Sequence, residues 1–213
     1  MTELIKTYGA PLLRAIGTHT LYVMISVTAG FALGVVLGVL LSRIPKWSGI
    51  IMPLLSVFQT IPGLVFIGVL YIVWGGTPLS VITALSVYAM FPVLKNTYAG
   101  ILSVEQKYVE AARGCGMSTL QTLIKVEIPL AIPTIMAGLR MATIYTVSWA
   151  VLASMIGLGG LGNFVYQGVD SNNNTLILLG AVPAAMLAIV LGAVVDRIQK
   201  KITPGGLRKE VRK

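Results

Sequence analysis

Long apolar blocks alternate with short polar stretches along this chain, and their lengths predict membrane-spanning helices. Residues 21–41 carry no charge, and about 20 apolar residues are enough to cross the ~30 Å hydrocarbon core of a bilayer. Between Trp47 and Leu94 there is again no charged residue. That length suits two spans, with a Gly-Gly-Thr-Pro turn at residues 75–78. We therefore expect one transmembrane domain, 1–213, with five spans at about residues 21–41, 50–73, 79–101, 130–156 and 176–195.

Two stretches depart from this apolar pattern. Residues 1–20 mix charged and apolar positions, and we expect a short interfacial helix there. Within the second span, residues 59–63 read Gln-Thr-Ile-Pro-Gly, a polar and helix-breaking cluster at membrane depth. Broken helix is tolerated at that depth only where protein or water satisfies the backbone. The cluster is therefore either an interruption that faces the bundle interior or a simple proline kink with buried polar side chains.

The longest polar interruption, residues 104–129, separates the third and fourth spans. Apolar residues recur at helical spacing in its first half, with charges on the other face, which predicts a short amphipathic helix. Gly114 and Gly116 are expected to end that helix, because glycine adopts the left-handed conformation at little cost. Ser118, with a glutamine three residues later, predicts a capping box that opens a second short helix, which Pro129 is expected to end. This helix–turn–helix is either a docking element for a groove on another protein or a solvated connector.

Composition and charge place the chain in a membrane and orient it. Of its 213 residues, 56% are hydrophobic and 11% are charged, whereas soluble domains carry about 25% charged residues. The net charge of +9 does not form a nucleic-acid patch. Thirteen of the sixteen Lys and Arg residues fall in the loop after residue 42, in residues 95–125 and in the C-terminal tail. The positive-inside rule then places the N-terminus outside and both the 104–129 stretch and the C-terminus in the cytoplasm. The single cysteine, Cys115, excludes an intramolecular disulfide.

Arg140 is the one charged residue that we place well inside a predicted span. A charge at the bilayer centre costs about 2.5–3.5 kcal/mol on insertion scales. Arg140 therefore either faces a water-filled vestibule, with Glu127 or Glu105 as its ion-pair partner, or extends as a snorkelling side chain toward the inner surface.

Aromatic side chains on the same span suggest a substrate class. Trp149 and Tyr145 lie four residues apart and so share a helix face. Aromatic faces bind quaternary ammonium groups by cation–π attraction, worth about 2 kcal/mol or more when desolvated. We expect these two rings, with the polar side chains of Gln59 and Thr60, to line a transport path. The alternative for the rings is interfacial anchoring or core packing.

A glycine-rich turn follows the fourth span. Gly157, Gly159 and Gly162 match GxGxxG formally, but the match follows a membrane helix instead of a strand, so a dinucleotide site is not indicated. We interpret residues 157–162, which include Gly160, as an outer turn at the gate where a binding protein releases substrate.

Residues 110–129 also resemble a known family motif. Glu110–Ala112, Gly116 and the run Val126–Pro129 resemble the EAA motif of ABC importer permeases in their spacing, with Val126 and Ile128 as conservative departures. Further stretches are similar to the permeases for glycine betaine, carnitine and choline, and this similarity covers about residues 18–207. Those stretches are residues 59–62, 95–100, 127–133 and 157–162.

The resemblance implies the permease subunit of an ATP-driven importer of these solutes, with a binding-protein-dependent permease fold in the bacterial cell membrane. It further implies that a coupling site docks on a cytoplasmic ABC ATPase dimer, and that a separate binding protein, extracellular or periplasmic, delivers the substrate. Carried over by position, the coupling residues are Glu110, Ala111, Ala112, Gly116 and Pro129.

The sequence bears on the partners in two further ways. The chain contains no Gly-Lys dipeptide and hence no Walker A loop, so we expect no enzyme activity and expect ATP and Mg²⁺ to be bound by the ATPase partner. Five spans are too few to enclose a pathway, so we expect a dimer with an identical or similar permease chain. Two alternatives stay open: an importer of the same class for another small solute, and a stand-alone secondary transporter. For the latter, paired acids inside the spans are the expected sign, and we place none centrally.

Overall fold

The structure is a computed structural model whose described residues are 2–154, 157 and 159–204. The predicted end of the fourth span at Ile156, Leu158 of the glycine-rich turn, and the basic tail from residue 205 onward lie outside the described residues. In chain order the helices are α1 (Thr2–Arg43), α2 (Pro45–Phe58), α3 (Gly63–Trp74), α4 (Pro78–Leu102), α5 (Gln106–Gly114), α6 (Thr119–Thr122), the π-helix η1 (Leu123–Glu127), α7 (Ile128–Ala153), α8 (Gly162–Asp170) and α9 (Asn174–Ile202).

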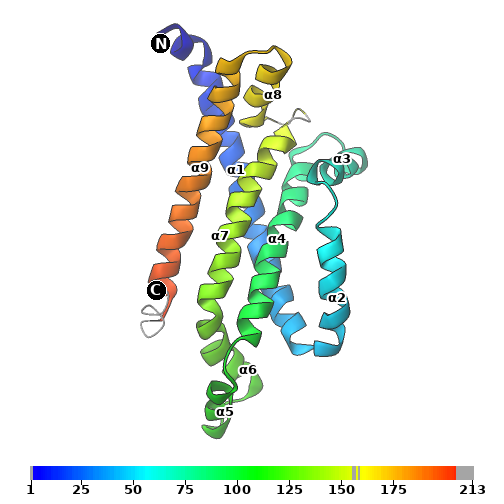
Figure 1. Cartoon of the computed structure of the whole chain (residues 1–213), viewed down its shortest axis with the longest axis vertical. Coiled ribbons are helices and arrows are strands. Elements are labelled where there is room, and N and C mark those ends of the chain that lie inside the picture. Colours follow the sequence, from blue (N-terminus) through cyan, green and yellow to red (C-terminus); the bar gives the residue numbers. More distant parts are fainter. Residues whose placement is uncertain (1, 155–156, 158, 205–213) are drawn as a thin grey trace.

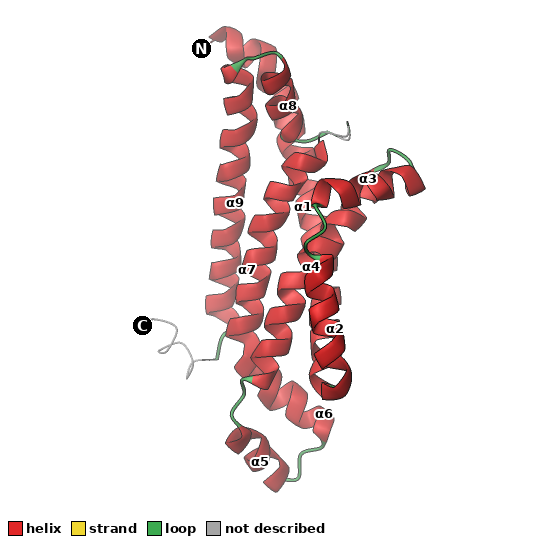
Figure 2. Ribbon diagram, turned by 45° about the vertical axis from the view of Figure 1, so that its right-hand side comes forward, coloured by secondary structure: helices red, strands yellow, loops and turns green. Residues whose placement is uncertain are grey.

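The long helices α1, α4, α7 and α9 run side by side as an elongated bundle (Figures 1 and 2). Each is long and apolar enough to cross a membrane, α7 together with the helical turns that precede it, and the bent pair of α2 and α3 passes the same test as a unit. Up to five spans result among the described residues, which confirms the predicted all-α membrane fold. The start of α1 and helix α8 lie at one end of the bundle, and α5 and α6 lie at the other (Figure 1).

A stripe of glycines on α1 brings that helix against α4. A Cβ atom added to Gly30, Gly34 or Gly38 would lie 2.7–2.8 Å from the nearest atom of α4, which is closer than real side chains approach. Small residues allow such close backbone contact between membrane helices. The stripe therefore serves helix packing, and it fixes how α1 and α4 are aligned.

The core lies among α1, α3, α4 and α7. Ile67 is 1% exposed and carries α3 into this core, so the bent pair is anchored to the bundle through its second helix. The buried members are Val23, Val27, Ile67, Val81, Ala84, Leu85, Val147, Ala150 and Ala153.

The second predicted span is two helices instead of one. α2 and α3 are bent by 89° relative to each other across the break between them. Pro62 directly precedes α3 as its N-cap residue, and a proline cannot donate the backbone hydrogen bond that would continue α2. The structure thus decides between the two sequence-based alternatives in favour of a helix interruption over a simple kink.

Two other local predictions are wrong. Residues 2–20 form no separate interfacial helix, because α1 is continuous from Thr2 to Arg43 and tolerates Pro11 inside it. Pro129 does not end the second short helix of the polar stretch. It occupies the first turn of α7, and α6, η1 and α7 follow one another without a break.

Candidate functional site

The polar stretch folds as the predicted helix, glycine turn and second helix. α5 ends in a Schellman motif, in which the Met117 amide donates to the Ala112 carbonyl (3.1 Å) and the Gly116 amide donates to the Arg113 carbonyl (2.9 Å). Gly116 has φ +79°, a left-handed conformation that disfavours residues with a Cβ. The turn therefore depends on glycine at this position.

The second helix opens with the predicted capping box. The Gln121 amide donates to the Ser118 hydroxyl (3.3 Å), and the Ser118 amide donates to the Gln121 side chain (2.8 Å). The backbone amides of Ser118 and Gln121, which the helix start leaves without a backbone partner, are satisfied in this way. Because neighbouring residues make all of these contacts, the turn between α5 and α6 is locally specified.

The two faces of α5 differ in their exposure to solvent. Val109 and Ala112 are buried against the rest of the segment, whereas Glu110 and Ala111 are exposed. The Glu105 carboxylate pairs with Lys107 and raises the pKa of that ammonium group. Among the ion pairs between described residues none involves Glu110, so its carboxylate is available to a basic group of a partner.

The junction between this segment and α7 is a π-helix with a buried acid. Glu127 is 5% exposed, and its carboxylate accepts two hydrogen bonds from the Arg43 guanidinium at the end of α1, one of them at 3.3 Å. π-Helical turns are rare and often occur at functional positions. Here the turn presents Glu127 to α1, so the 104–129 segment is connected to α1 as well as to α7.

At the α2–α3 break, polar side chains of the interruption contact α4. The Lys95 ammonium donates to the Gln59 amide oxygen (2.6 Å), and the Tyr88 hydroxyl donates to the Ile61 carbonyl (2.7 Å). Thr60 is exposed and bonds only its own helix, to the Val57 carbonyl. Gln59 and Thr60 thus both lie at the break, but only the Gln59 side chain contacts α4.

Five aromatic rings surround this break. Tyr88 stacks on Trp149 with centroids 5.3 Å apart and an interplanar angle of 27°. Phe58, Phe66 and Phe91 contact Tyr88 or one another, with centroids 5.4–6.4 Å apart. Offset stacking and edge-to-face contacts are the preferred aromatic geometries. We call these five residues the aromatic cluster.

The structure separates the two rings that the sequence paired on α7. Trp149 is half-buried within the aromatic cluster, against Gly63 of α3. Tyr145 is 52% exposed, and no ring contact between described residues includes it. Trp149 therefore packs in the core, and Tyr145 faces outward from this chain.

The expected ion-pair partners of Arg140 are wrong. The Arg140 Nε donates to the Asp196 carboxylate of α9 (3.0 Å), and both side chains are partly exposed. Glu127 is instead taken by Arg43, and Glu105 by Lys107. Asp196 was missed because the predicted fifth span ended at the residue before it.

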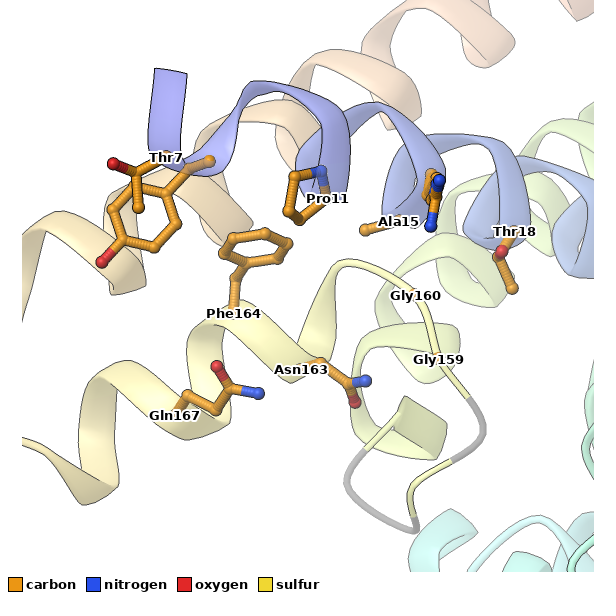
Figure 3. Close-up of a pocket in the computed structure, with 11 residues that line it drawn as sticks. Thr7, Pro11, Ala15, Thr18, Gly159, Gly160, Asn163, Phe164 and Gln167 are labelled. Atoms are coloured by element: carbon orange, nitrogen blue, oxygen red, sulfur yellow. The ribbon is translucent and has the colours of Figure 1, made fainter. Parts of the chain in front are cut away.

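The glycine turn after α7 adjoins a cavity at the α8 end of the bundle. Gly157, Gly159 and Gly160 have φ of +83°, +84° and +106°, so the turn depends on glycine at three positions. Gly162 starts α8 and packs directly against the Val151 carbonyl. A cavity of about 440 Å³ opens between α1 and α8 and is lined by residues such as Tyr8, Arg14, Asn163, Phe164 and Gln167, with Gly159 and Gly160 also at its wall (Figure 3).

Several contributors to these sites have no role that the sequence alone indicates. Tyr88, Lys95 and Asp196 become recognisable only through contacts with residues far away in the chain. Lys95 is half-buried although it carries a charge. Within the described part of the chain, no three His, Cys, Asp or Glu residues gather where they could hold a metal ion.

Comparison with known proteins agrees with this architecture. A membrane-length helical bundle with a helix–turn–helix at one end is the architecture of an ABC importer permease. The MetNI methionine ABC transporter, in inward-facing conformations, matches with a TM-score of 0.83 over 93% of this chain and 99% of that chain, at 23% identity. At that identity the likeness concerns the fold alone.

Sequence comparison gives the family. Residues 30–205 match the model of the binding-protein-dependent transport system inner membrane component, and the chain belongs to this family of permease subunits. The glycine betaine/carnitine/choline transport system permease protein OpuCB of Bacillus subtilis is 39% identical over 99% of this chain and 98% of that protein. The carnitine transport permease protein OpuCB of Listeria monocytogenes is 37% identical over 94% of this chain and 92% of that protein.

Proposed function

We propose that this chain forms the translocation pathway of an ATP-driven importer for quaternary ammonium compatible solutes such as glycine betaine, carnitine and choline. The observation that carries the substrate class is the near-full-length similarity to relatives named for these solutes. The aromatic cluster at the helix break supports it, because aromatic faces attract quaternary ammonium groups without requiring hydrogen bonds. Along the path we place Gln59, Thr60, Tyr145, Trp149 and Arg140, whose charge is balanced by an acid of α9.

Coupling to ATP hydrolysis is assigned to the 104–129 segment. In this proposal α5 docks on a cytoplasmic ATPase, with the exposed Ala111 permitting close approach and Glu110 pairing with a basic residue of the ATPase. Ala112, which is buried, holds α5 in place. Gly116 holds the turn, and Pro129 connects the segment to α7. The chain contains no Gly-Lys dipeptide and hence no Walker A loop, so in this proposal ATP and Mg²⁺ bind to the ATPase dimer. The end of the bundle that carries α5 accordingly faces the cytoplasm.

The remaining partners follow from the permease role. One chain offers at most five spans among its described residues, so a second permease, identical or similar, completes the pathway. A substrate-binding protein docks at the opposite end, where Gly157, Gly159, Gly160 and Gly162 shape the turn into α8.

Purification and transport measurements test the proposal together. The tagged chain, expressed with the genes of its importer, is purified from detergent, and uptake of labelled glycine betaine, carnitine and choline is measured in proteoliposomes with and without internal ATP. We expect an ATPase to co-purify and at least one of these solutes to enter only with ATP. A chain that carries no ATPase and supports uptake without ATP would contradict the coupling assignment, and ATP-driven uptake of none of the three would contradict the substrate class.

A further inference from the structure

Lys95 has an unusual environment for a cation within a membrane span. Its ammonium group lies on α4 and donates to the neutral amide oxygen of Gln59 at 2.6 Å. None of the ion pairs between described residues includes Lys95, although the side chain is half-buried. Charged groups removed from water normally have a partner of opposite charge. The amide oxygen of Gln59 thus occupies the place where a carboxylate would be bound more strongly.

Each partner of this contact has a phenylalanine close to it along the chain. Phe91 is one helical turn from Lys95 on α4, so the two side chains share a face. Phe58 precedes Gln59 and contacts the Phe91 ring with centroids 5.6 Å apart. Both the amide that holds the cation and a ring of the aromatic cluster therefore come from the last residues before the α2–α3 break.

The chemistry of the rings favours a quaternary over a primary ammonium group. The side chains of Phe58, Phe66 and Phe91 have no hydrogen-bond acceptor, and the Tyr88 hydroxyl is already committed to the Ile61 carbonyl. A primary ammonium group would lose its hydrogen bonds to water here without replacement. A quaternary ammonium group has no such bonds to lose, and aromatic faces attract it.

From these contacts we propose that the seam between Gln59 and the aromatic cluster is a binding site for a zwitterion that carries both a quaternary ammonium group and a carboxylate. Lys95 binds the carboxylate in place of Gln59. The rings of Phe58 and Phe91 separate from each other and contact the ammonium group instead. The site prefers glycine betaine or carnitine to choline, which has the ammonium group but no carboxylate. This inference rests on the proposed function and assigns the chemical discrimination to the permease itself.

The helix break explains how such a site opens. In this structure the seam is closed by its own side chains, because the rings contact one another and Gln59 contacts Lys95. Discontinuous membrane helices commonly form substrate sites, since their interrupted backbone can move separately. A shift of the end of α2 away from α4 separates both pairs of contacts at once and exposes the cation and the rings together.

Ligand-observed NMR on the permease–ATPase complex without its binding protein tests the site directly. Saturation transfer to the N-methyl protons of glycine betaine and of choline is titrated in nanodiscs, in the nucleotide-free and vanadate-trapped states. We expect glycine betaine to bind in at least one state, with a Kd about tenfold or more below that of choline, as expected for one charge-assisted hydrogen bond. No binding of glycine betaine in either state, or equal affinity for the two probes, overturns the proposal.

Two variants with matched controls assign the preference to named residues. Lys95→Gln should make the affinities for glycine betaine and choline equal. Lys46→Gln, which changes an exposed lysine in the first turn of α2, should leave the preference unchanged. Gln59→Glu supplies an internal carboxylate to Lys95 and strengthens the fold at this point, so it should lose the preference without unfolding. A preference that persists in both Lys95→Gln and Gln59→Glu overturns the assignment.

The rings are tested separately from the cation. Phe58→Leu should weaken the binding of both probes by roughly thirtyfold, because cation–π attraction in desolvated sites is worth about 2 kcal/mol. Phe31→Leu, a half-buried phenylalanine outside the cluster, should weaken neither. Equal effects of the two changes count against the aromatic half of the site. ATP-driven uptake of glycine betaine by the complete importer is measured in parallel. Uptake without binding at the permease removes only this inference, whereas absence of uptake removes the proposed function.

Discussion

The Arg43 guanidinium at the end of α1 and the Glu127 carboxylate in the π-helix η1 form a two-point ion pair between segments 84 positions apart in the chain. Glu127 is almost fully buried, while the Arg43 side chain remains 34% exposed. Removing one partner of a buried pair leaves an uncompensated charge, and this is more costly than the pair is worth. The contact therefore constrains the position of α1 relative to the coupling segment.

Glu127→Gln should lower both stability and transport. Breaking a buried pair typically lowers the free energy of unfolding by about 3–5 kcal/mol, and we expect a smaller loss here because Arg43 retains contact with water. We also expect less solute to be taken up per ATP hydrolysed. Thermal unfolding and the ratio of uptake to ATP hydrolysis, both measured on the reconstituted importer, check this. The exchanged pair Arg43→Glu with Glu127→Arg should recover part of the loss. No recovery, with each single change as harmful as the double one, would show that the pairing itself is not what matters.

The capping box of α6 offers a smaller, local effect. Ser118→Ala removes the hydroxyl that accepts from the Gln121 amide, and loss of an N-cap side chain costs about 1 kcal/mol. Hydrogen exchange at the first amides of α6 should therefore become about fivefold faster. Thr119→Ala, at the next position, is the control and should leave the exchange rates close to those of the unmodified chain. Unchanged exchange in Ser118→Ala would mean that contacts with the rest of the protein hold this turn.

The local parts of the fold were predictable from the sequence because their signals are local. The Schellman turn depends on Gly116, and the capping box depends on residues three positions apart. The start of a helix at a proline is less informative, since Pro129 is compatible both with the end of one helix and with the first turn of another. For that reason the continuous passage from α6 into α7 was missed.

The candidate binding site was predictable only in part. Gln59 and Trp149 were noticed because polar and aromatic residues stand out in an apolar span. Their partners, Lys95 and Tyr88, belong to another helix, and only the packing of α4 against the α2–α3 break brings them together. Likewise, Arg140 gave a clear signal as a charge in a span, but its partner, Asp196, depends on how far α9 extends beyond the apolar run.

Gly63 provides a test of the packing at the helix break. A Cβ atom at this position would overlap the Trp149 ring, so Gly63→Ala should force α3 away from α7. Overpacking of this kind typically costs about 1–3 kcal/mol, and thermal unfolding of the purified complex measures it. Gly68→Ala lies on the same helix with no atom within 4 Å of the added Cβ and should be neutral or stabilising. If both changes have the same effect, the close contact between Gly63 and Trp149 is not a constraint on the fold.

Gly116 provides the sharpest test of the coupling segment. A valine there must adopt φ near +79°, which costs roughly 1–2 kcal/mol for a residue with a Cβ and more for a β-branched one. Because no atom lies within 4 Å of the added Cβ, the cost comes from the backbone alone and should alter the turn between α5 and α6 while leaving the membrane helices intact. We expect normal membrane insertion, weaker co-purification of the ATPase and loss of ATP-driven uptake.

Gly114→Ala is the matched control for that change. Gly114 lies two positions earlier, as the last residue of α5, and the added methyl group would also meet no other atom within 4 Å. Replacing a helical glycine by alanine stabilises a helix by about 0.5–1 kcal/mol, so uptake and ATPase recovery should be maintained. The contrast between the two glycines isolates the left-handed turn from the mere addition of a side chain. If Gly116→Val transports as well as Gly114→Ala, the segment between α4 and α7 acts as a connector, and coupling must occur through another surface.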